Sequence, residues 1–125
     1  MDAKKKILVV DDESNIRLLV KSMIGNYYDV LDASDGDEAL IKAQKEKPDL
    51  VLLDILMPKK DGFTTCYELK SNKATAAIPV VMLTALHYKL DEKLALSLRA
   101  DGYIRKPFTS QELLSKIDTI LSAKP

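Results

Sequence analysis

The stretch "ILVVDDESN" (residues 7–15) joins a short apolar run to a group of acidic residues. Its four apolar residues, three of them β-branched, predict a buried strand. Asp11, Asp12 and Glu13 follow where this strand leaves the core. Adjacent carboxylates repel one another, and a strand end does not need them, so the pattern indicates that these acids bind a cation.

Four more apolar runs follow along the chain. Runs such as "DLVLLD" (49–54) and "IPVVMLT" (78–84) are apolar throughout and do not alternate with polar residues. Continuous apolar strands are typical of a parallel sheet that is covered on both faces. We therefore predict parallel strands at residues 7–10, 28–33, 50–53, 79–83 and 102–105.

Helical patterns separate and follow these strands. Apolar residues repeat at helical spacing over residues 16–24, with Gly25 as a stop, and Thr109 and Ser110 offer a capped start to the last helix. The predicted helices cover residues 16–24, 37–47, 63–71, 89–99 and about 110–121. Five β-then-α units with right-handed crossovers predict an α/β fold with a doubly wound parallel sheet.

Polar side chains gather where the predicted strands end. Asp11 and Asp12 follow the first strand, Asp54 the third, Thr84 the fourth and Lys106 the fifth. In doubly wound sheets, ligands bind outside the carboxyl ends of the strands. We therefore expect these five side chains to form one site.

The composition of this site indicates phosphoryl chemistry with a hard metal ion. Three carboxylates offer only oxygen ligands, which suit Mg²⁺. Lysine and threonine opposite them suit a phosphoryl group, and an aspartate can itself become an acyl phosphate. His87 and Cys66 stand alone in the sequence, so a zinc site is not indicated.

Length and composition set limits on the class of protein. The chain has 125 residues, 46% of them hydrophobic, and 19 basic residues balance 19 acidic ones. Zero net charge gives no support for a nucleic-acid or membrane-surface binder. The chain has a single cysteine and no signal-like start, and its apolar runs fall short of the roughly 20 residues that a membrane span needs. These features predict one cytoplasmic domain.

Four motifs carry a resemblance to a known family. "ILVVDDE" (7–13), "PDLVLLDILMPKKDGF" (48–63), "PVVMLTA" (79–85) and "ADGYIRKPF" (100–108) resemble the receiver domain of two-component response regulators, a single-domain, chemotaxis-regulator-like one. The resemblance covers residues 1–125 as one receiver domain, with no output domain after the last helix. It implies a flavodoxin-like five-stranded sheet of order 2-1-3-4-5 with five helices. Whether the chain is a stand-alone regulator or a domain cut from a longer protein is left open.

The resemblance also implies roles for individual residues. Asp54 would be the phosphoacceptor, and Lys106 would pair with the phosphoryl oxygens, its bond to Pro107 being cis. Asp12, Asp54 and the backbone carbonyl of Leu56 would bind Mg²⁺ directly, with Mn²⁺ as a substitute, and Asp11 would complete the metal site mainly through a metal-bound water.

Partners and signalling follow from the same resemblance. The phosphoryl group would come from a sensor histidine kinase or a histidine phosphotransfer protein. Thr84 would move toward it and Tyr103 would turn inward, switching the face of the fourth helix, fifth strand and fifth helix for a downstream protein target. The chain would thus be a signalling switch and not a metabolic enzyme. It would make no direct contact with nucleic acid or membrane. Whether phosphorylation makes it dimerise is left open.

Several alternatives compete with these interpretations. The acids after the first strand could cap the next helix, although one acid would suffice and Ser14 offers a better cap. The chain could be a degenerate receiver that acts as a phosphorylation-independent scaffold, against which the full set of site residues argues. A flavodoxin would need a phosphate-binding loop after the first strand, and a haloacid-dehalogenase-type phosphatase a D-x-D pattern there; "DDES" offers neither.

Two positions next to the site are apolar. Leu56 and Leu86 lie two residues beyond Asp54 and Thr84, at places that are often polar in the family. With leucine at both, less hydrogen bonding is available to orient an attacking water. We therefore expect slow self-dephosphorylation.

Overall fold

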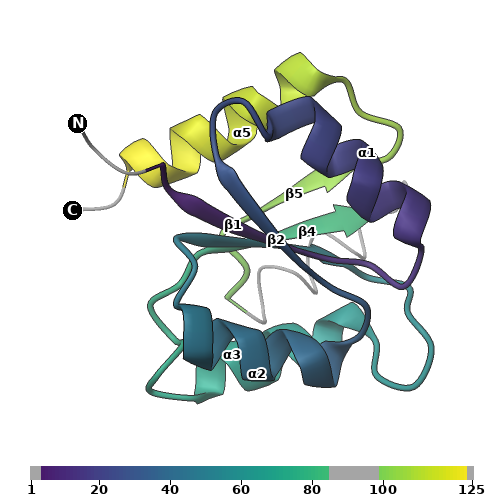
Figure 1. Ribbon diagram of the computed structural model, residues 1–125. Coiled ribbons are helices and arrows are strands. Elements are labelled where there is room, and N and C mark those ends of the chain that lie inside the picture. Colours follow the sequence, from purple (N-terminus) through teal and green to yellow (C-terminus); the bar gives the residue numbers. More distant parts are fainter. Residues whose placement is uncertain (1–3, 85–98, 124–125) are drawn as a thin grey trace.

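The computed structural model of the protein describes residues 4–84 and 99–123. Five parallel strands form one sheet in the order β2-β1-β3-β4-β5. Helices cover both faces of this sheet, so the predicted α/β class, doubly wound topology and strand order are confirmed (Figure 1). The strands are β1 (Lys6–Val10), β2 (Asp29–Ala33), β3 (Leu50–Asp54), β4 (Val80–Thr84) and β5 (Gly102–Arg105).

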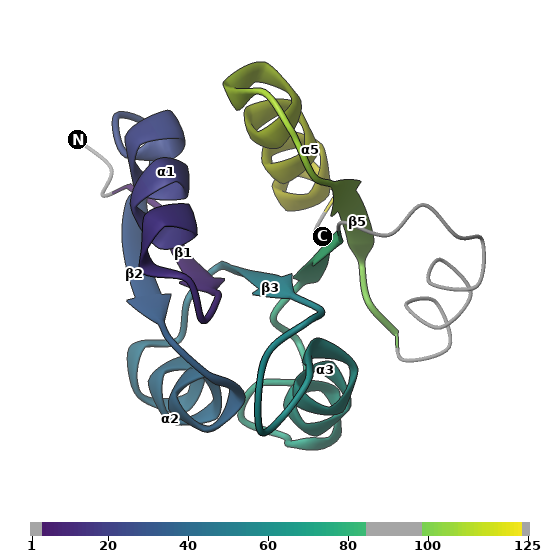
Figure 2. The ribbon, with the colours of Figure 1, turned by 90° about the vertical axis from the view of Figure 1, so that its right-hand side faces the viewer.

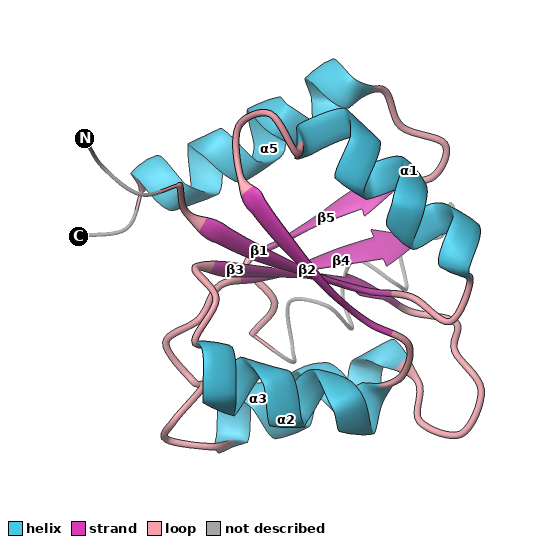
Figure 3. Cartoon of the chain, viewed as in Figure 1, coloured by secondary structure: helices cyan, strands magenta, loops and turns pink. Residues whose placement is uncertain are grey.

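The helices pack in two layers. Figures 2 and 3 show α1 and α5 on one side of the sheet and α2 and α3 on the other. The helix predicted at residues 89–99 falls outside the described residues, apart from its last residue, so four of the five predicted helices are observed. The four are α1 (Ser14–Ile24), α2 (Gly36–Glu46), α3 (Gly62–Ser71) and α5 (Ser110–Ser122).

Alternate residues of each strand face opposite layers. On β1, Ile7 and Val9 join the core beneath α1 and α5, whereas Leu8 and Val10 join the core beneath α2 and α3. All four are fully buried. This two-sided burial is why the strands are apolar at every position.

Side-chain caps fix the start of three helices. Asp35 accepts a hydrogen bond from the Glu38 amide at α2, and Asp61 accepts one from the Thr64 amide at α3. At α5, Thr109 and Glu112 form a reciprocal capping box. These caps satisfy amides that have no partner inside the helix, and they set where each helix begins.

Within the described residues, every helix is too short or too polar to cross a membrane.

Candidate functional site

Three carboxylates meet at the carboxyl ends of β1 and β3. Asp11 and Asp12 follow β1, and Asp54 is the last residue of β3, the strand beside it. One oxygen from each lies within 4.8 Å of the others. Asp11 is fully buried, Asp54 is 6% exposed and Asp12 is exposed. The predicted acidic cluster is thus formed, with two of its members inside the protein.

Lys106 reaches this cluster from the end of β5. Its Nζ lies 3.2 Å from Oδ2 of Asp11 and 3.1 Å from Oδ1 of Asp54. Its backbone N–H donates to the carbonyl of Thr84, 2.6 Å away, which ties the residue to the end of β4. The bond from Lys106 to Pro107 is cis, as the sequence resemblance implied.

The backbone and side chain of Asp11 are both held in place. Its N–H donates to the Ala33 carbonyl at 3.1 Å, and its Oδ1 accepts from the Glu13 amide at 2.9 Å. The idea that Ser14 caps α1 is wrong, because Glu13 occupies the cap position and makes no side-chain cap bond. The Asp11 carboxylate accepts the hydrogen bond of the Glu13 amide instead. Ser14 is the first residue of the helix.

Arg17 of α1 supports the cluster and was not found by sequence reasoning. Its Nη1 donates to the backbone carbonyl of Asp11 at 2.7 Å, and its Nε contacts Oδ2 of Asp32 at 3.2 Å. It therefore ties the ends of β1 and β2 together. The sequence shows only a basic residue in the first turns of the helix that comes after Asp11 and Asp12. Such a residue is usually solvated, so it does not stand out as part of a site.

Burial and charge act against each other at Asp54. Desolvation has the largest influence on the pKa of Asp54 and raises it. The charge of Lys106 lowers this pKa and the charge of Asp11 raises it, and the net result lies above the ordinary value. For Lys106, desolvation lowers the pKa, but Asp54 and Asp11 together outweigh it and the pKa is raised. With all groups charged, three carboxylates and one ammonium leave a net charge of −2.

This cluster has the donor set of a hard divalent cation. The carboxylates of Asp11, Asp12 and Asp54 are oxygen ligands, and their charge matches that of a doubly charged ion. Among residues 4–84 and 99–123, no nitrogen or sulfur ligand belongs to the cluster. The residues present thus fit Mg²⁺ better than zinc.

The remaining predicted site residues lie on or just after strands β3, β4 and β5, apart from one that is outside the described residues. Thr84 is buried at the end of β4, and its neighbour Leu83 is in register with Asp54. Tyr103 of β5 is half-buried and packs against the core beneath α2 and α3. Leu56 follows β3 and is 61% exposed. Leu86 lies outside the described residues.

An apolar hollow borders the cluster on the side of α1. It has a volume of about 340 Å³ and is lined by Ile16, Leu19, Lys106, Pro107 and Phe108. Leu19 is 44% exposed, and its neighbour Leu18 is 67% exposed. Apolar surface therefore lies directly beside Lys106.

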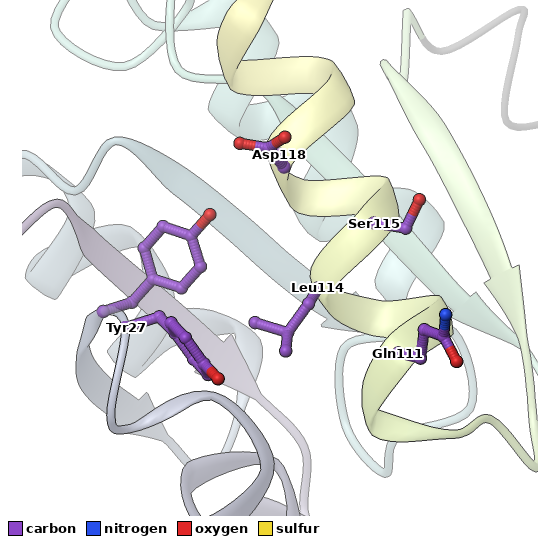
Figure 4. Close-up of a pocket in the computed structure, with 6 residues that line it drawn as sticks. Tyr27, Gln111, Leu114, Ser115 and Asp118 are labelled. Carbon is purple, nitrogen blue, oxygen red and sulfur yellow. The ribbon is translucent and has the colours of Figure 1, made fainter.

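A second hollow, of about 520 Å³, lies between the end of α1 and α5, away from the acids (Figure 4). Leu114 points from α5 toward Tyr27. Burial, and then the charge of Asp118, raise the pKa of Tyr28. The polar groups here are two phenols, an amide, a hydroxyl and a single carboxylate, which do not form a metal or phosphoryl site.

Comparison with known proteins decides the family. The family model described as "Response regulator receiver domain" matches residues 7–118. The chain belongs to the response regulator receiver domains. Members of this family are signalling switches that bind Mg²⁺ at an acidic pocket and interact with histidine kinases and downstream targets.

Relatives and solved structures agree with this assignment. The receiver domain is 48% identical to the alkaline phosphatase synthesis transcriptional regulatory protein PhoP of Bacillus subtilis, over 94% of this chain and 48% of that protein. The chain spans about half the length of the first curated relatives it matches.

The chemotaxis protein CheY4 of Vibrio cholerae has a similar structure, with a TM-score of 0.90, 32% identity, and coverage of 94% of this chain and 99% of that one. The receiver domain of the sensor histidine kinase PA1611 of Pseudomonas aeruginosa has a TM-score of 0.89 and 25% identity, with coverage of 97% and 100%. Its structure holds a magnesium ion in the active-site cleft.

Proposed function

We propose that this receiver domain accepts a phosphoryl group on Asp54 and thereby switches a protein-binding face. The donor would be a phosphohistidine on a sensor histidine kinase or on a histidine phosphotransfer protein. The observation that supports this most directly is the buried Asp54 carboxylate, which lies with two other carboxylates and 3.1 Å from the Lys106 ammonium. Residues 1–125 would act as one receiver unit.

The transfer is a displacement at phosphorus. An Asp54 carboxylate oxygen forms the new O–P bond, while the bond from phosphorus to the donor histidine nitrogen breaks. The electron pair of that bond stays on the nitrogen, and the imidazole regains its neutral form by taking a proton from solvent. Lys106, already beside Asp54, would bind an oxygen of the transferred group.

Asp11, Asp12, Asp54 and the backbone carbonyl of Leu56 would hold Mg²⁺, with Mn²⁺ as a substitute. When bound, the ion supplies positive charge that offsets the negative phosphoryl oxygens. Arg17 would keep Asp11 in position through the Asp11 carbonyl. The net charge of −2 without the ion explains why a phosphoryl group would not approach unaided.

Signal output would use the face around β5 and α5. Thr84 lies at the end of β4, and its register partner Arg105 follows Tyr103 by two residues on β5. A movement of Thr84 toward the phosphoryl group would therefore reach Tyr103 through adjacent strands. A hollow of about 480 Å³ lies between β5 and α5, with Tyr103, Arg105 and Lys116 in its lining. A downstream protein target would bind there.

The apolar hollow beside Lys106 would receive the donor protein. Its lining from Ile16, Leu19 and Phe108 offers hydrophobic contact next to the acids, whose charge would otherwise favour only cations. A helix that presents its phosphohistidine beside apolar residues would match this surface.

The test is intact mass after incubation with acetyl phosphate. We expect the wild type to gain one base-labile phosphoryl group in Mg²⁺ and none after Mg²⁺ is removed with EDTA. Asp54→Asn should gain none, because the amide lacks the nucleophilic oxygen. Asp61→Asn, at the helix cap of the same loop, is the matched control and should still be modified.

A folded wild type without any adduct, in Mg²⁺ or in Mn²⁺, would contradict the proposal. The phosphorylation-independent scaffold would then be the better account of the protein. An adduct that persists in Asp54→Asn would place the nucleophile elsewhere.

A further inference from the structure

Lys60 joins the loop after β3 to two helices. Its Nζ lies 2.7 Å from Oδ1 of Asp37 on α2 and 2.8 Å from Oε1 of Glu68 on α3. The Lys60 side chain is 22% exposed. One ammonium group therefore bridges two carboxylates that would otherwise repel each other across the α2–α3 contact.

The stem of the Lys60 side chain is also confined. It passes over Gly36, the first residue of α2, where an added Cβ would lie 2.8 Å from Cδ of Lys60 and 2.2 Å from Oγ1 of Thr65. Gly36 thus leaves the space through which the lysine reaches both helices. The hydrogen bonds to Asp37 and then to Glu68 raise the pKa of Lys60, so the bridge stays charged at neutral pH.

The loop that Lys60 anchors begins directly after the proposed phosphoacceptor. Residues 55–61 connect Asp54 to α3, and the amide of Gly62 donates to the Ile55 carbonyl at 2.8 Å. The Lys60 amide donates to the Pro58 carbonyl at 2.8 Å, closing the tip of the loop. Leu56, whose carbonyl is a proposed Mg²⁺ ligand, lies between these two ties.

We propose that Lys60 is a positioning residue, which holds residues 55–61 against α2 and α3 and so raises the affinity of the acidic site for Mg²⁺. This inference rests on the Mg²⁺ site of the proposed function. A ligand that is already in place loses less conformational freedom when the ion binds, and so the ion binds more tightly.

The sign of the effect separates positioning from simple electrostatics. Removing a positive charge near an acidic site strengthens cation binding if charge alone matters. Loss of positioning weakens it. Lys59 is the natural control, because it is the neighbouring lysine and makes no ion pair with the described residues.

The experiment is a calorimetric titration with Mg²⁺ at fixed ionic strength. Lys60→Met removes the bridge and keeps the apolar stem, and we expect the affinity to fall about three- to tenfold. Loss of an outer-shell partner of a ligand costs about 10–100-fold, and Lys60 acts one step further away. Lys59→Met should bind as the wild type does or slightly more tightly, and Lys60→Arg should retain the wild-type affinity.

A second readout does not depend on the metal. In Lys60→Met, amide deuterium exchange of the peptide that covers residues 55–61 should be faster without Mg²⁺, and thermal unfolding should report an intact fold. Unchanged or tighter Mg²⁺ binding in Lys60→Met would overturn the inference, as would a wild type that binds no Mg²⁺. A wild type that binds Mg²⁺ but accepts no phosphoryl group would instead overturn the proposed function. The Mg²⁺ affinities of the wild type and Lys60→Met would then still decide this inference.

Discussion

At the scale of single residues, Asp54 is a buried carboxyl whose proposed function requires its charged form. Burial is the largest influence on its carboxyl and raises the pKa above the ordinary value of 3.8, although Lys106 opposes the rise. The folded protein therefore holds this proton to higher pH than the unfolded chain does. Stability then falls as the pH rises from the ordinary value through the raised pKa, and it stays reduced at neutral pH.

Asp54→Asn should for this reason be more stable than the wild type at pH 7 without Mg²⁺. We expect a gain of about 1 kcal/mol in the free energy of unfolding, a typical gain when a functional group is removed from a destabilising site. Urea unfolding at pH 7 and at pH 3.5 measures it. The gain should shrink at the lower pH, where Asp54 is protonated in the wild type. A variant that is less stable at pH 7 would mean that the pair with Lys106 outweighs burial.

Leu56 offers a test of the expected slow self-dephosphorylation. This residue is 61% exposed and lies two residues beyond Asp54, so a change there should leave the fold intact. Leu56→Asn adds a hydrogen-bonding group that can orient water near the phosphoryl group. We expect the phosphoryl lifetime to shorten severalfold, measured by the decay of the intact-mass adduct. An unchanged lifetime would refute this account of Leu56.

At the scale of elements, the start of α3 packs directly on the end of β3. An added Cβ at Gly62 would lie 2.2 Å from the carbonyl oxygen of Asp54 and 2.7 Å from Cα of Ile55. Both atoms belong to the backbone, so no side chain can turn aside to make room. The close contact of these two elements therefore requires glycine at this position.

Gly62→Ala should disturb both stability and phosphorylation. We expect a loss of about 1–3 kcal/mol in the free energy of unfolding, as for other overpacked sites, and slower adduct formation because the Asp54 backbone must move. Gly102→Ala is the control, since its Cβ would meet the end of the flexible Ile120 side chain at 3.0 Å. Equal effects of the two substitutions on phosphorylation would argue against a role for the α3–β3 contact.

At the scale of the whole molecule, the site exists only when the sheet is assembled. Lys106 and Asp11 are 95 residues apart in the chain, and their side chains meet because β5 and β1 end at the same edge. An ion that binds this site binds only the folded protein. Its binding free energy therefore adds to the free energy of unfolding.

Mg²⁺ should accordingly stabilise the wild type against heat and denaturant. At ten times its dissociation constant we expect a gain of about 1.4 kcal/mol in the free energy of unfolding, from the linkage relation for one site. Asp12→Asn should lose most of this gain while folding normally, because Asp12 is exposed. NaCl at matched ionic strength is the control. The same gain in Asp12→Asn would mean that the ion binds elsewhere.

The sequence by itself determined the elements that the structure describes and the members of the acidic cluster. Apolar runs predicted the strands to within a residue at either end, because two-sided burial leaves no polar positions in "LVLL" or "VVML". The acids stood out because a strand end needs no like charges. Strand order required the family resemblance, since apolar runs do not say which strands are neighbours.

Only the tertiary structure decided how the site is held together. Arg17 on the Asp11 carbonyl and Lys60 between Asp37 and Glu68 are surface-type residues in the sequence, where nothing separates them from solvated charges. Their partners are backbone atoms or side chains on other elements. Such contacts arise from the directions in which packed helices and loops point their side chains, and those directions are set by the assembled sheet and its helix layers.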